Sequence, residues 1–352
     1  YVCGTEGGYE RIDGYERYSG QPKPSDATYY YCPCSFTGVG PSVGDTITGV
    51  DSGSTAEVIV VGSDYINVTK RSAALNADEV YNVGGSPKGT FTAAQAEKGE
   101  TTAALHAAAL NLAADVYRAD ISAPTGSNAA GKGGVQMLNG ILYAFLDNAG
   151  ATAGLIYKES ASGWTAVTPG NEISFTTGTA EISDGDTVTQ LVSGASATAN
   201  RVVLESGTWA GGDAAGRLIL GTITGTFDAT NILQVGAANK ATASSLATAI
   251  TISPGGRYEF DVYNFTGSTA TLRIYGCDGV NRGFEFDGTH YVPIDTGMTT
   301  DTPTHVKAFK QQLFFSFKGS SQNSGVGLPY QWTAVLGAAE IAVGDDITGY
   351  LV

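Results

Sequence analysis

The most regular feature of the chain is a short alternation of apolar and polar residues, interrupted at close intervals by glycine, asparagine and aspartate. It is clearest in residues 258–335. Such alternation is typical of half-buried β-strands, and turn residues this closely spaced indicate antiparallel meanders rather than βαβ units. In residues 284–292, Asp287-Gly288 separates two alternating runs and predicts a hairpin with a type I′ turn, which needs positive φ at both central residues.

An earlier segment, residues 135–167, has the same pattern, with Asn139-Gly140 as its first turn. Both segments end in an expected aromatic strand with the sequence WTAV, at residues 164–167 and 332–335. Blocks of about 40 to 50 residues, each with several short strands, are the sequence form of β-propeller blades. We therefore expect a propeller-like meander body.

This body is expected to comprise a blade in residues 122–174 and further blades in residues 246–352. Only about three blocks are visible, whereas a propeller needs at least four blades to close. Either the chain continues past Val352 or the meanders pack as a sandwich. We expect a longer parent chain, because the sequence lacks an initiator methionine and stops inside an expected strand.

A second repeat begins with a Gly-Asp-Thr tract and lies outside the meanders. Asp45 and Ser52 are seven residues apart, and so are Asp186 and Ser193. The repeat predicts a small β-barrel of five or six strands that is inserted twice. The two copies are expected to span residues 36–90 and 175–245.

The aspartates of these tracts could be imagined as ligands for calcium or a sugar. A Gly-Asp pair before a strand is more often a turn in which the aspartate accepts backbone N–H groups, and we expect that role here.

Residues 92–120 are rich in alanine and predict the one long α-helix. Its apolar face is expected from residues that recur with helical spacing: Leu105, Ala109, Leu112 and Val116. Residues 91–121 would then be a helix and linker, serving as a strut between domains or as a multimer interface. Residues 1–35, with the local duplication YERxxGYERYxG, are expected to be an extended N-terminal arm that docks on a neighbour, or an edge hairpin.

The composition agrees with a mainly-β fold: a β-propeller-like meander body, two small inserted β-barrel domains and one long α-helix. Of 352 residues, 48 are glycine, 42% are hydrophobic and only 15% are charged. The net charge of −15 makes the chain a poor candidate for gripping nucleic acid through its phosphates. No apolar run reaches the ~20 residues of a membrane span, and we expect neither a span nor a signal peptide.

Residues with reactive or metal-binding side chains are few and scattered. The four cysteines are Cys3, Cys32, Cys34 and Cys277. Their spacing is wrong for a zinc site, so we expect reduced thiols, with a disulfide from Cys3 to Cys32 or Cys34 as the alternative. The three histidines, His106, His290 and His305, follow no metal-binding pattern. The sequence therefore predicts no metal and no cofactor.

Two features could be read as catalytic. The glycine-rich tract of residues 84–90 contains a lysine, but its spacing is wrong for a phosphate-binding loop. Glu285 and Asp287 lie two apart on one strand, so their carboxylates face the same side and could form a glycoside-cleaving pair. Surface carboxylates with this spacing are common, and the sequence predicts no enzyme and no catalytic residue.

Four long tracts resemble uncharacterised virion structural proteins of tailed bacteriophages: residues 8–27, 275–294, 301–317 and 332–351. Short-tailed phages carry hexameric β-propeller proteins as the nozzle or hub of the tail tube. The resemblance implies a homo-oligomeric ring in the virion tail, assembled in the host cytoplasm. It also implies contacts with other tail proteins such as an adaptor and fibres, and transient, nonspecific contact with phage DNA.

The expected function is therefore structural: a ring-forming tail nozzle or hub protein that lines or caps the DNA exit channel. The first alternative is a receptor- or glycan-binding protein on the virion surface. The second alternative is a capsid-associated or glycan-cleaving virion protein.

Overall fold

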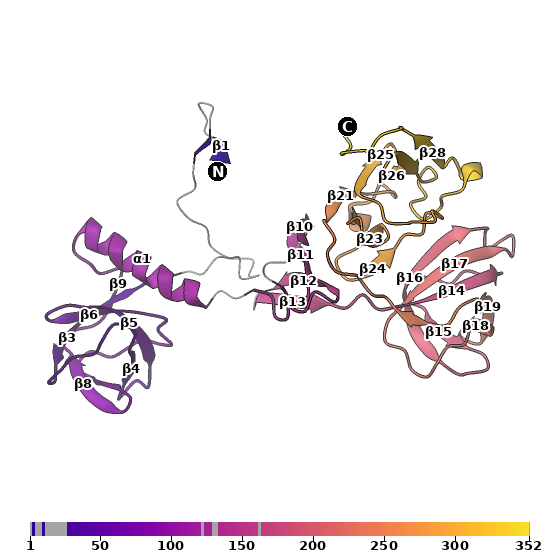
Figure 1. Cartoon of the computed structure of the whole chain (residues 1–352). Helices are drawn as coiled ribbons and strands as arrows, with labels where there is room; N and C mark the ends of the chain where they lie inside the picture. Colours follow the sequence, from indigo (N-terminus) through magenta and orange to yellow (C-terminus); the bar gives the residue numbers. More distant parts are fainter. Residues whose placement is uncertain are drawn as a thin grey trace. The chain divides into compact units, whose positions relative to one another are not determined.

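The computed structural model describes residues 27–120, 123–128, 133–160 and 163–351, and the backbone of a pairing between β1 (Val2–Cys3) and β2 (Tyr9–Glu10). The chain divides into two compact units, Tyr1–Ala123 and Pro124–Val352 (Figure 1). Both are built mainly from antiparallel strands, which confirms the mainly-β prediction. Most of the expected arm lies outside the described residues.

A closed six-stranded barrel forms the body of the first unit. Its strands are β3 (Tyr30–Phe36), β4 (Thr46–Gly49), β5 (Thr55–Val61), β6 (Tyr65–Thr69), β7 (Val80–Val83) and β8 (Ser86–Phe91). They pair in the order β6-β5-β4-β7-β8-β3, and β6 pairs with β3 to close the ring. A short strand, β9 (Ala96–Glu97), pairs with β3 as well. The interior is filled by apolar side chains such as Ile47, Val58 and Tyr81.

A second closed barrel with the same topology lies in the second unit. Its strands are β14 (Asn171–Gly178), β15 (Thr187–Gln190), β16 (Ser196–Ser206), β17 (Ala214–Leu220), β18 (Ile232–Val235) and β19 (Ala238–Ala243), with β20 (Thr248–Ala249) paired to β14 as β9 is to β3. The register agrees as well: Tyr30 pairs with Val68 in one copy, and Asn171 with Leu220 in the other. The repeat in the sequence is thus a repeat of strand pairing.

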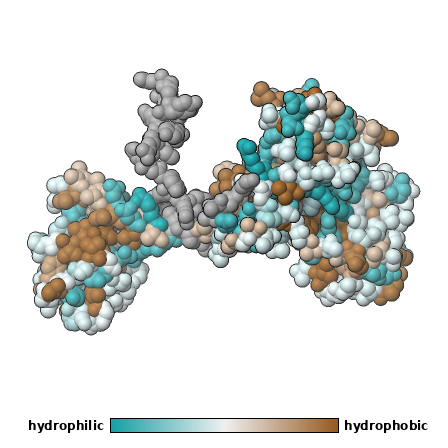
Figure 2. Space-filling view, viewed as in Figure 1, coloured by the Kyte–Doolittle hydropathy of each residue, from teal (hydrophilic) through white to brown (hydrophobic). Residues whose placement is uncertain are grey.

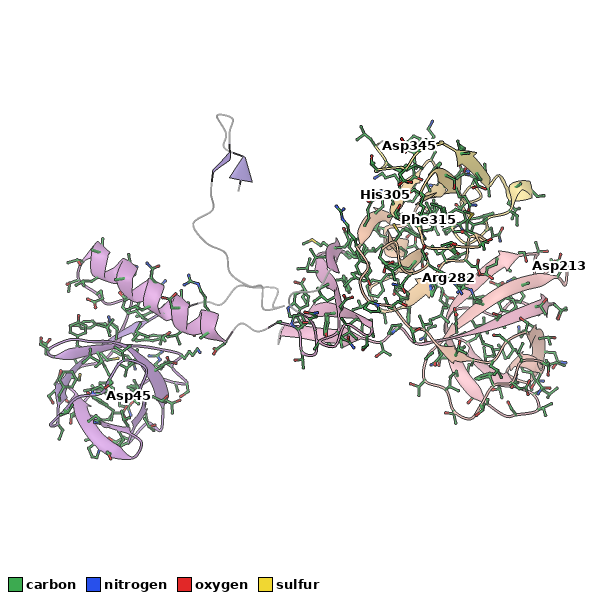
Figure 3. The ribbon with its side chains drawn as sticks, in the orientation of Figure 1. Asp45, Asp213, Arg282, His305, Phe315 and Asp345 are labelled. Carbon is green, nitrogen blue, oxygen red and sulfur yellow. The ribbon has the colours of Figure 1, made fainter. Side chains whose placement is uncertain are left out.

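The Gly-Asp-Thr tracts form turns, as predicted. Asp45 Oδ2 accepts the backbone N–H of Ser42 at 2.7 Å, and Asp186 Oδ2 accepts that of Ser183 at 2.8 Å (Figure 3 labels Asp45). Residues 30–35 were expected in the arm but belong to strand β3. The prediction missed this strand because its sequence, with a central proline, lacks the alternation that marks the other strands.

Helix α1 (Ala103–Ala119) packs against the outside of the first barrel. It begins at the Thr102 cap, whose side chain accepts the Leu105 N–H, so it is shorter than predicted. Its buried residues are Ala109 and Ala113, which contact Tyr29 and Ile59. Leu105 and Leu112, expected on the buried face, are 46% and 39% exposed, whereas Leu110 and Val116 pack against the cluster. Figure 2 shows an apolar patch over β5 and α1.

Three antiparallel meanders of four strands make up the rest of the second unit. The first contains β10 (Gly133–Leu138), β11 (Ile141–Asp147), β12 (Gly154–Ser160) and β13 (Gly163–Val167). The second contains β21 (Glu259–Tyr263), β22 (Arg273–Cys277), β23 (Phe284–Phe286) and β24 (Tyr291–Pro293), with the 3₁₀ turn η1 (Thr269–Thr271). The third contains β25 (His305–Phe309), β26 (Gln312–Phe317), β27 (Ser320–Asn323) and β28 (Ala339–Ala342), with the 3₁₀ turn η2 (Ala334–Leu336).

Two of the local predictions for these meanders need correction. The second WTAV tract is not a strand: Trp332 stacks on Phe315, its indole N–H bonds the Pro329 carbonyl, and η2 follows. The hairpin at Asp287-Gly288 exists, but only Gly288 has positive φ, and Asp287 Oδ1 instead accepts the N–H groups of Thr289 and His290. A side chain thus takes the place of the predicted type I′ geometry. Asn139 and Gly140 do both have positive φ.

The meanders pack on one another in chain order. An aromatic cluster joins the first to the second, with Phe145 within 5.7 Å, ring centre to ring centre, of four other aromatic rings. On its other face, the second meander packs Tyr275 and Cys277 against Leu313 and Phe315 of the third. The middle meander is therefore buried on both faces. Its first strand, β21, contacts both β10 and β25, the first strands of its neighbours.

Candidate functional site

The predicted carboxylate pair lies where the second barrel meets the middle meander. Glu285 is 4% exposed and Asp287 follows it at the end of β23. Arg201, from barrel strand β16, places Nη2 2.6 Å from Asp287 Oδ2 and 3.7 Å from Glu285 Oε1. Both carboxylates thus face one side, as the strand spacing predicts. On that side lie Arg201 and, 3.6 Å from Glu285 Oε1, the Nε of Arg273.

Hydrogen bonds around Asp287 favour its charged form. Burial opposes ionisation of Asp287, but hydrogen bonds from the ring and backbone of His290 and from the Thr289 N–H outweigh it and lower the pKa of Asp287. The Tyr275 hydroxyl donates to Glu285 Oε2 at 2.8 Å, and burial followed by the charge of Glu285 raises the pKa of Tyr275. The lowered pKa keeps Asp287 charged, so its ion pair with Arg201 joins the hairpin to the barrel.

Replacing Asp287 with asparagine is expected to destabilise the second unit at pH 7, and the deficit is expected to narrow below about pH 4. The folded-state pKa of Asp287 is lowered, so its ionised form stabilises the fold above the unfolded-state pKa, and this contribution is lost as the pH falls toward the folded-state value. Urea unfolding at pH 7 and below about pH 4 measures the difference in free energy of unfolding between the variant and the unsubstituted chain, with Asp345→Asn at an exposed position as control. A deficit independent of pH would contradict the assignment.

A second arginine from the barrel, Arg217, donates hydrogen bonds to two carboxylates and one backbone carbonyl. Arg217, on β17, is 5% exposed. Its Nε donates to Glu205 Oε1 and its Nη1 to Glu172 Oε2, each at 2.8 Å, and its Nη2 donates to the Pro293 carbonyl at 2.6 Å. Sequence reasoning missed both arginines. The signal for Arg217 was a lone charge inside an apolar strand, AAGRLIL, since such a charge must find partners once the strand is buried.

The histidines are separate, and each has its own partner. His106 Nδ1 lies 2.9 Å from the Tyr29 hydroxyl, His290 Nδ1 lies 3.0 Å from Asp287 Oδ2, and His305 Nδ1 lies 2.7 Å from Glu259 Oε2 (Figure 3 labels His305). In the part of the chain that the structure describes, no three His, Cys, Asp or Glu side chains are arranged to hold a metal ion.

The cysteines are buried in apolar packing. Cys32 and Cys34 point into the first barrel, Cys277 lies between two meanders, and all three are free thiols. Burial raises the pKa of Cys32 to about 12. The side chain of Cys3 lies outside the described residues. The glycine-rich tract forms the β7–β8 hairpin, with Gly84 and Gly85 in its turn.

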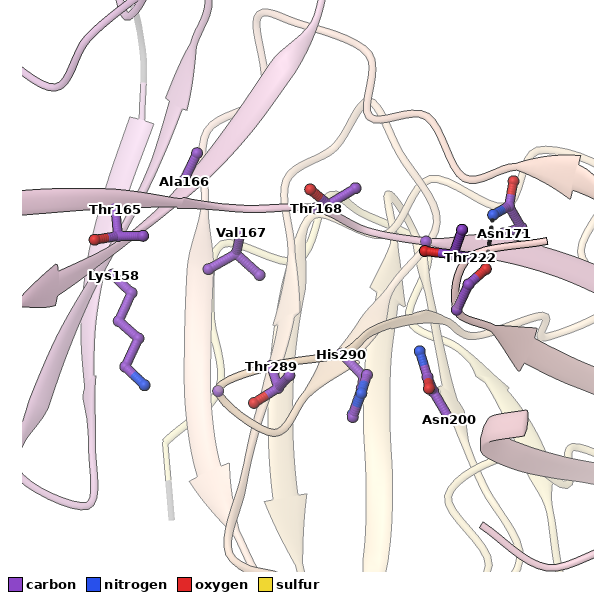
Figure 4. A pocket seen from close by; sticks show the side chains of 13 residues that line it. Lys158, Thr165, Ala166, Val167, Thr168, Asn171, Asn200, Thr222, Thr289 and His290 are labelled. Carbon is purple, nitrogen blue, oxygen red and sulfur yellow. Dashed lines mark hydrogen bonds between the residues drawn. The ribbon is translucent and has the colours of Figure 1, made fainter. Parts of the chain in front are cut away.

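A groove of about 500 Å³ opens between the first meander, the second barrel and the β23–β24 hairpin (Figure 4). Its charged or titratable residues are Lys158 and His290. Its polar and apolar lining residues are Thr165, Ala166, Val167, Thr168, Asn171, Asn200, Thr222 and Thr289. Neither Glu285 nor Asp287 is among them. No motif marks this groove in the sequence, because its residues come from four distant segments.

Comparisons of the chain with protein-family models, curated proteins and solved structures gave no match. Among the described residues, the structure contains no helix with the length and apolar character needed to span a membrane.

Proposed function

We propose that the chain is a structural protein of a phage virion, and that copies of it form a ring at the tail nozzle or hub. The residues that resemble tailed-phage virion proteins support this, and so does the packing of the meanders. The observation that carries it is the contact of β21 with both β10 and β25. First strands that meet in succession are the arrangement found around the axis of a propeller, where blades pack face to face.

Hydrogen bonds from side chains to backbone groups join the second and third meanders. Glu259 Oε1 accepts the Val306 N–H at 3.2 Å, and Asp261 Oδ2 accepts the Ala308 N–H at 2.7 Å. Side chains of β21 thus satisfy backbone groups on the free edge of β25. Edge groups that are satisfied in this way cannot recruit a foreign strand, so the joint is specific as well as stiff.

The charge of the chain suits a channel that DNA passes through. With −15 on each copy, a ring multiplies the negative charge around its opening, and DNA would be repelled from the wall rather than adhere to it.

Exposed apolar residues lie on both outer meanders of the stack and would supply the contacts between copies. Val135 and Met137 on β10 are 60% and 56% exposed, and Ile341 on β28 is 58% exposed. A contact between one outer meander and the opposite outer meander of the next copy is head-to-tail, and contacts of that kind form a ring when the rotation between copies closes.

Native mass spectrometry of the full chain at micromolar concentration tests the ring. A single closed oligomer is expected, and Met137→Asp is expected to reduce it to monomers because a charge cannot be buried at the contact without a partner. Val39→Asp, at an 83% exposed position in the first unit, is the matched control and should leave the oligomer unchanged. A monomer for the unsubstituted chain would count against the proposal.

A further inference from the structure

Hydrogen bonds within the two walls of the groove fix their shape, and these bonds leave the side chains of Lys158, Asn200 and Thr222 unused. Asp287 Oδ1 accepts the Thr289 and His290 N–H groups at 2.8 and 2.7 Å, which fixes the hairpin on one side. On the other side, Asn171 Nδ2 donates to the Gly221 carbonyl at 3.1 Å, tying the start of β14 to the end of β17. Walls fixed in this way are preorganised, which lowers the cost of binding a ligand.

The uncompensated charge of the groove is positive. In the part of the chain that the structure describes, the Lys158 ammonium has neither an ion pair nor a hydrogen bond. The nearest carboxylate on the hairpin, that of Asp287, is already paired with Arg201 at 2.6 Å and with His290 at 3.0 Å. His290 binds that carboxylate through Nδ1, which leaves Nε2 for a ligand. In a chain of net charge −15, this is a local site for an anion.

The remaining lining suits a molecule with many hydroxyl groups. Asn200 and Thr222 come from the barrel and have no side-chain partner among the described residues. Thr168 and Thr289 add hydroxyls from opposite walls, and Figure 4 shows these side chains arranged around a common space. Val167, between Thr165 and Thr168, gives one apolar strip of the kind that covers the C–H face of a sugar ring. A volume of about 500 Å³ is ordinary for a small-molecule site.

We propose that this groove binds an acidic saccharide, with the carboxylate on the Lys158 ammonium and the ring hydroxyls on His290, Asn200 and Thr222. The lysine ammonium makes strong charge-assisted hydrogen bonds to a carboxylate, an imidazole nitrogen accepts from a hydroxyl, and amides both donate to and accept from hydroxyls. This binding function goes beyond the structural role proposed above and does not depend on ring formation.

Titration of the full chain with D-glucuronic acid, followed by ligand-observed NMR, tests the site, with D-glucose and inorganic phosphate as parallel probes. Glucuronate is expected to bind about tenfold or more tightly than glucose, because only glucuronate carries a carboxylate that the Lys158 ammonium can bind. Lys158→Gln is expected to abolish that preference. Lys240→Gln, which removes the same charge from barrel strand β19 outside the groove, should leave it intact.

A further variant separates saccharide recognition from simple anion binding. Asn200→Ala is expected to weaken glucuronate severalfold and to leave phosphate unaffected. If phosphate competes with glucuronate at equal concentration and Asn200→Ala changes neither, the groove binds anions only and the proposal is wrong. Absence of glucuronate binding to a chain with unchanged thermal unfolding overturns it as well. Neither result bears on the ring, which native mass spectrometry tests.

Discussion

Replacing Arg217 with methionine is expected to lower the free energy of unfolding of the second unit by about 3–5 kcal/mol. Methionine keeps most of the side-chain volume but leaves Glu172, Glu205 and the Pro293 carbonyl without their donor. Removing one member of a buried ion cluster costs more than the cluster is worth as a whole, because the remaining charges stay desolvated.

Urea unfolding followed by tryptophan fluorescence measures this, because Trp164, Trp209 and Trp332 all lie in the second unit. Arg282→Met is the matched control: its guanidinium lies 3.8 Å from Asp295, both are nearly half exposed, and such pairs contribute about 0–1 kcal/mol.

The pH dependence of the Arg217→Met deficit gives a second readout. Burial, opposed by Arg217, raises the pKa of Glu205, and loss of the arginine raises it further. A carboxyl with a raised folded-state pKa stabilises the fold below its unfolded-state pKa, and that stability is lost as the pH rises through the folded-state value. The deficit should therefore be larger at pH 7 than at pH 5. If Arg217→Met and Arg282→Met lowered the free energy of unfolding by the same amount, the buried Arg217 cluster would contribute no more than an exposed ion pair, and the prediction would be wrong.

Replacing Phe145 with alanine is expected to cost the same unit about 3–5 kcal/mol. Phe145 is fully buried, and its ring lies 4.9 Å from that of Phe260 and 5.5 Å from that of Phe284, ring centre to ring centre. The substitution removes the first meander's central contact with the second. The cavity cannot collapse easily, because rigid aromatic side chains surround it.

Phe309→Ala provides the comparison, since Phe309 is 38% exposed at the end of β25 and should cost far less. The same fluorescence measurement serves both variants. A loss below about 1 kcal/mol for Phe145→Ala would mean that the meanders do not share one core.

Local features of this fold and its two small barrels were predictable from the sequence, but the strand that closes the first barrel was not. Alternating apolar residues marked the strands, and Asn139-Gly140 forms the turn that its residues demand. The repeated Asp45 and Asp186 turns revealed two copies of one unit. Strand β3, which closes the first barrel, was placed in an arm because its pairing with β6 and β8 depends on residues far along the chain.

Among the site residues, too, local spacing was predictable and contacts between distant segments were not. Strand spacing correctly put Glu285 and Asp287 on one side. It could not show that Arg201, 84 and 86 positions earlier in the chain (285 − 201 and 287 − 201), occupies that side. The second WTAV tract has the residues of a strand, but Trp332 stacks on Phe315 and its indole N–H bonds the Pro329 carbonyl, contacts with segments that no local pattern reveals. The groove could not be found at all, because no local pattern brings Lys158 and Asn200 together.

Two barrels with one pairing register in a single chain create a hazard during synthesis. Strand β14 emerges after the first barrel and presents a hydrogen-bonding pattern that β6 could accept as readily as β17. Misassembly between repeats is a known failure of such chains. Divergent side chains at matching positions discriminate between the partners: Tyr65 stacks on Tyr31 in one copy, whereas Arg217 bonds Glu172 in the other. A strand exchanged between the barrels would set Arg217 against Tyr31, or Tyr65 against Glu172, and would leave a charge without its partner.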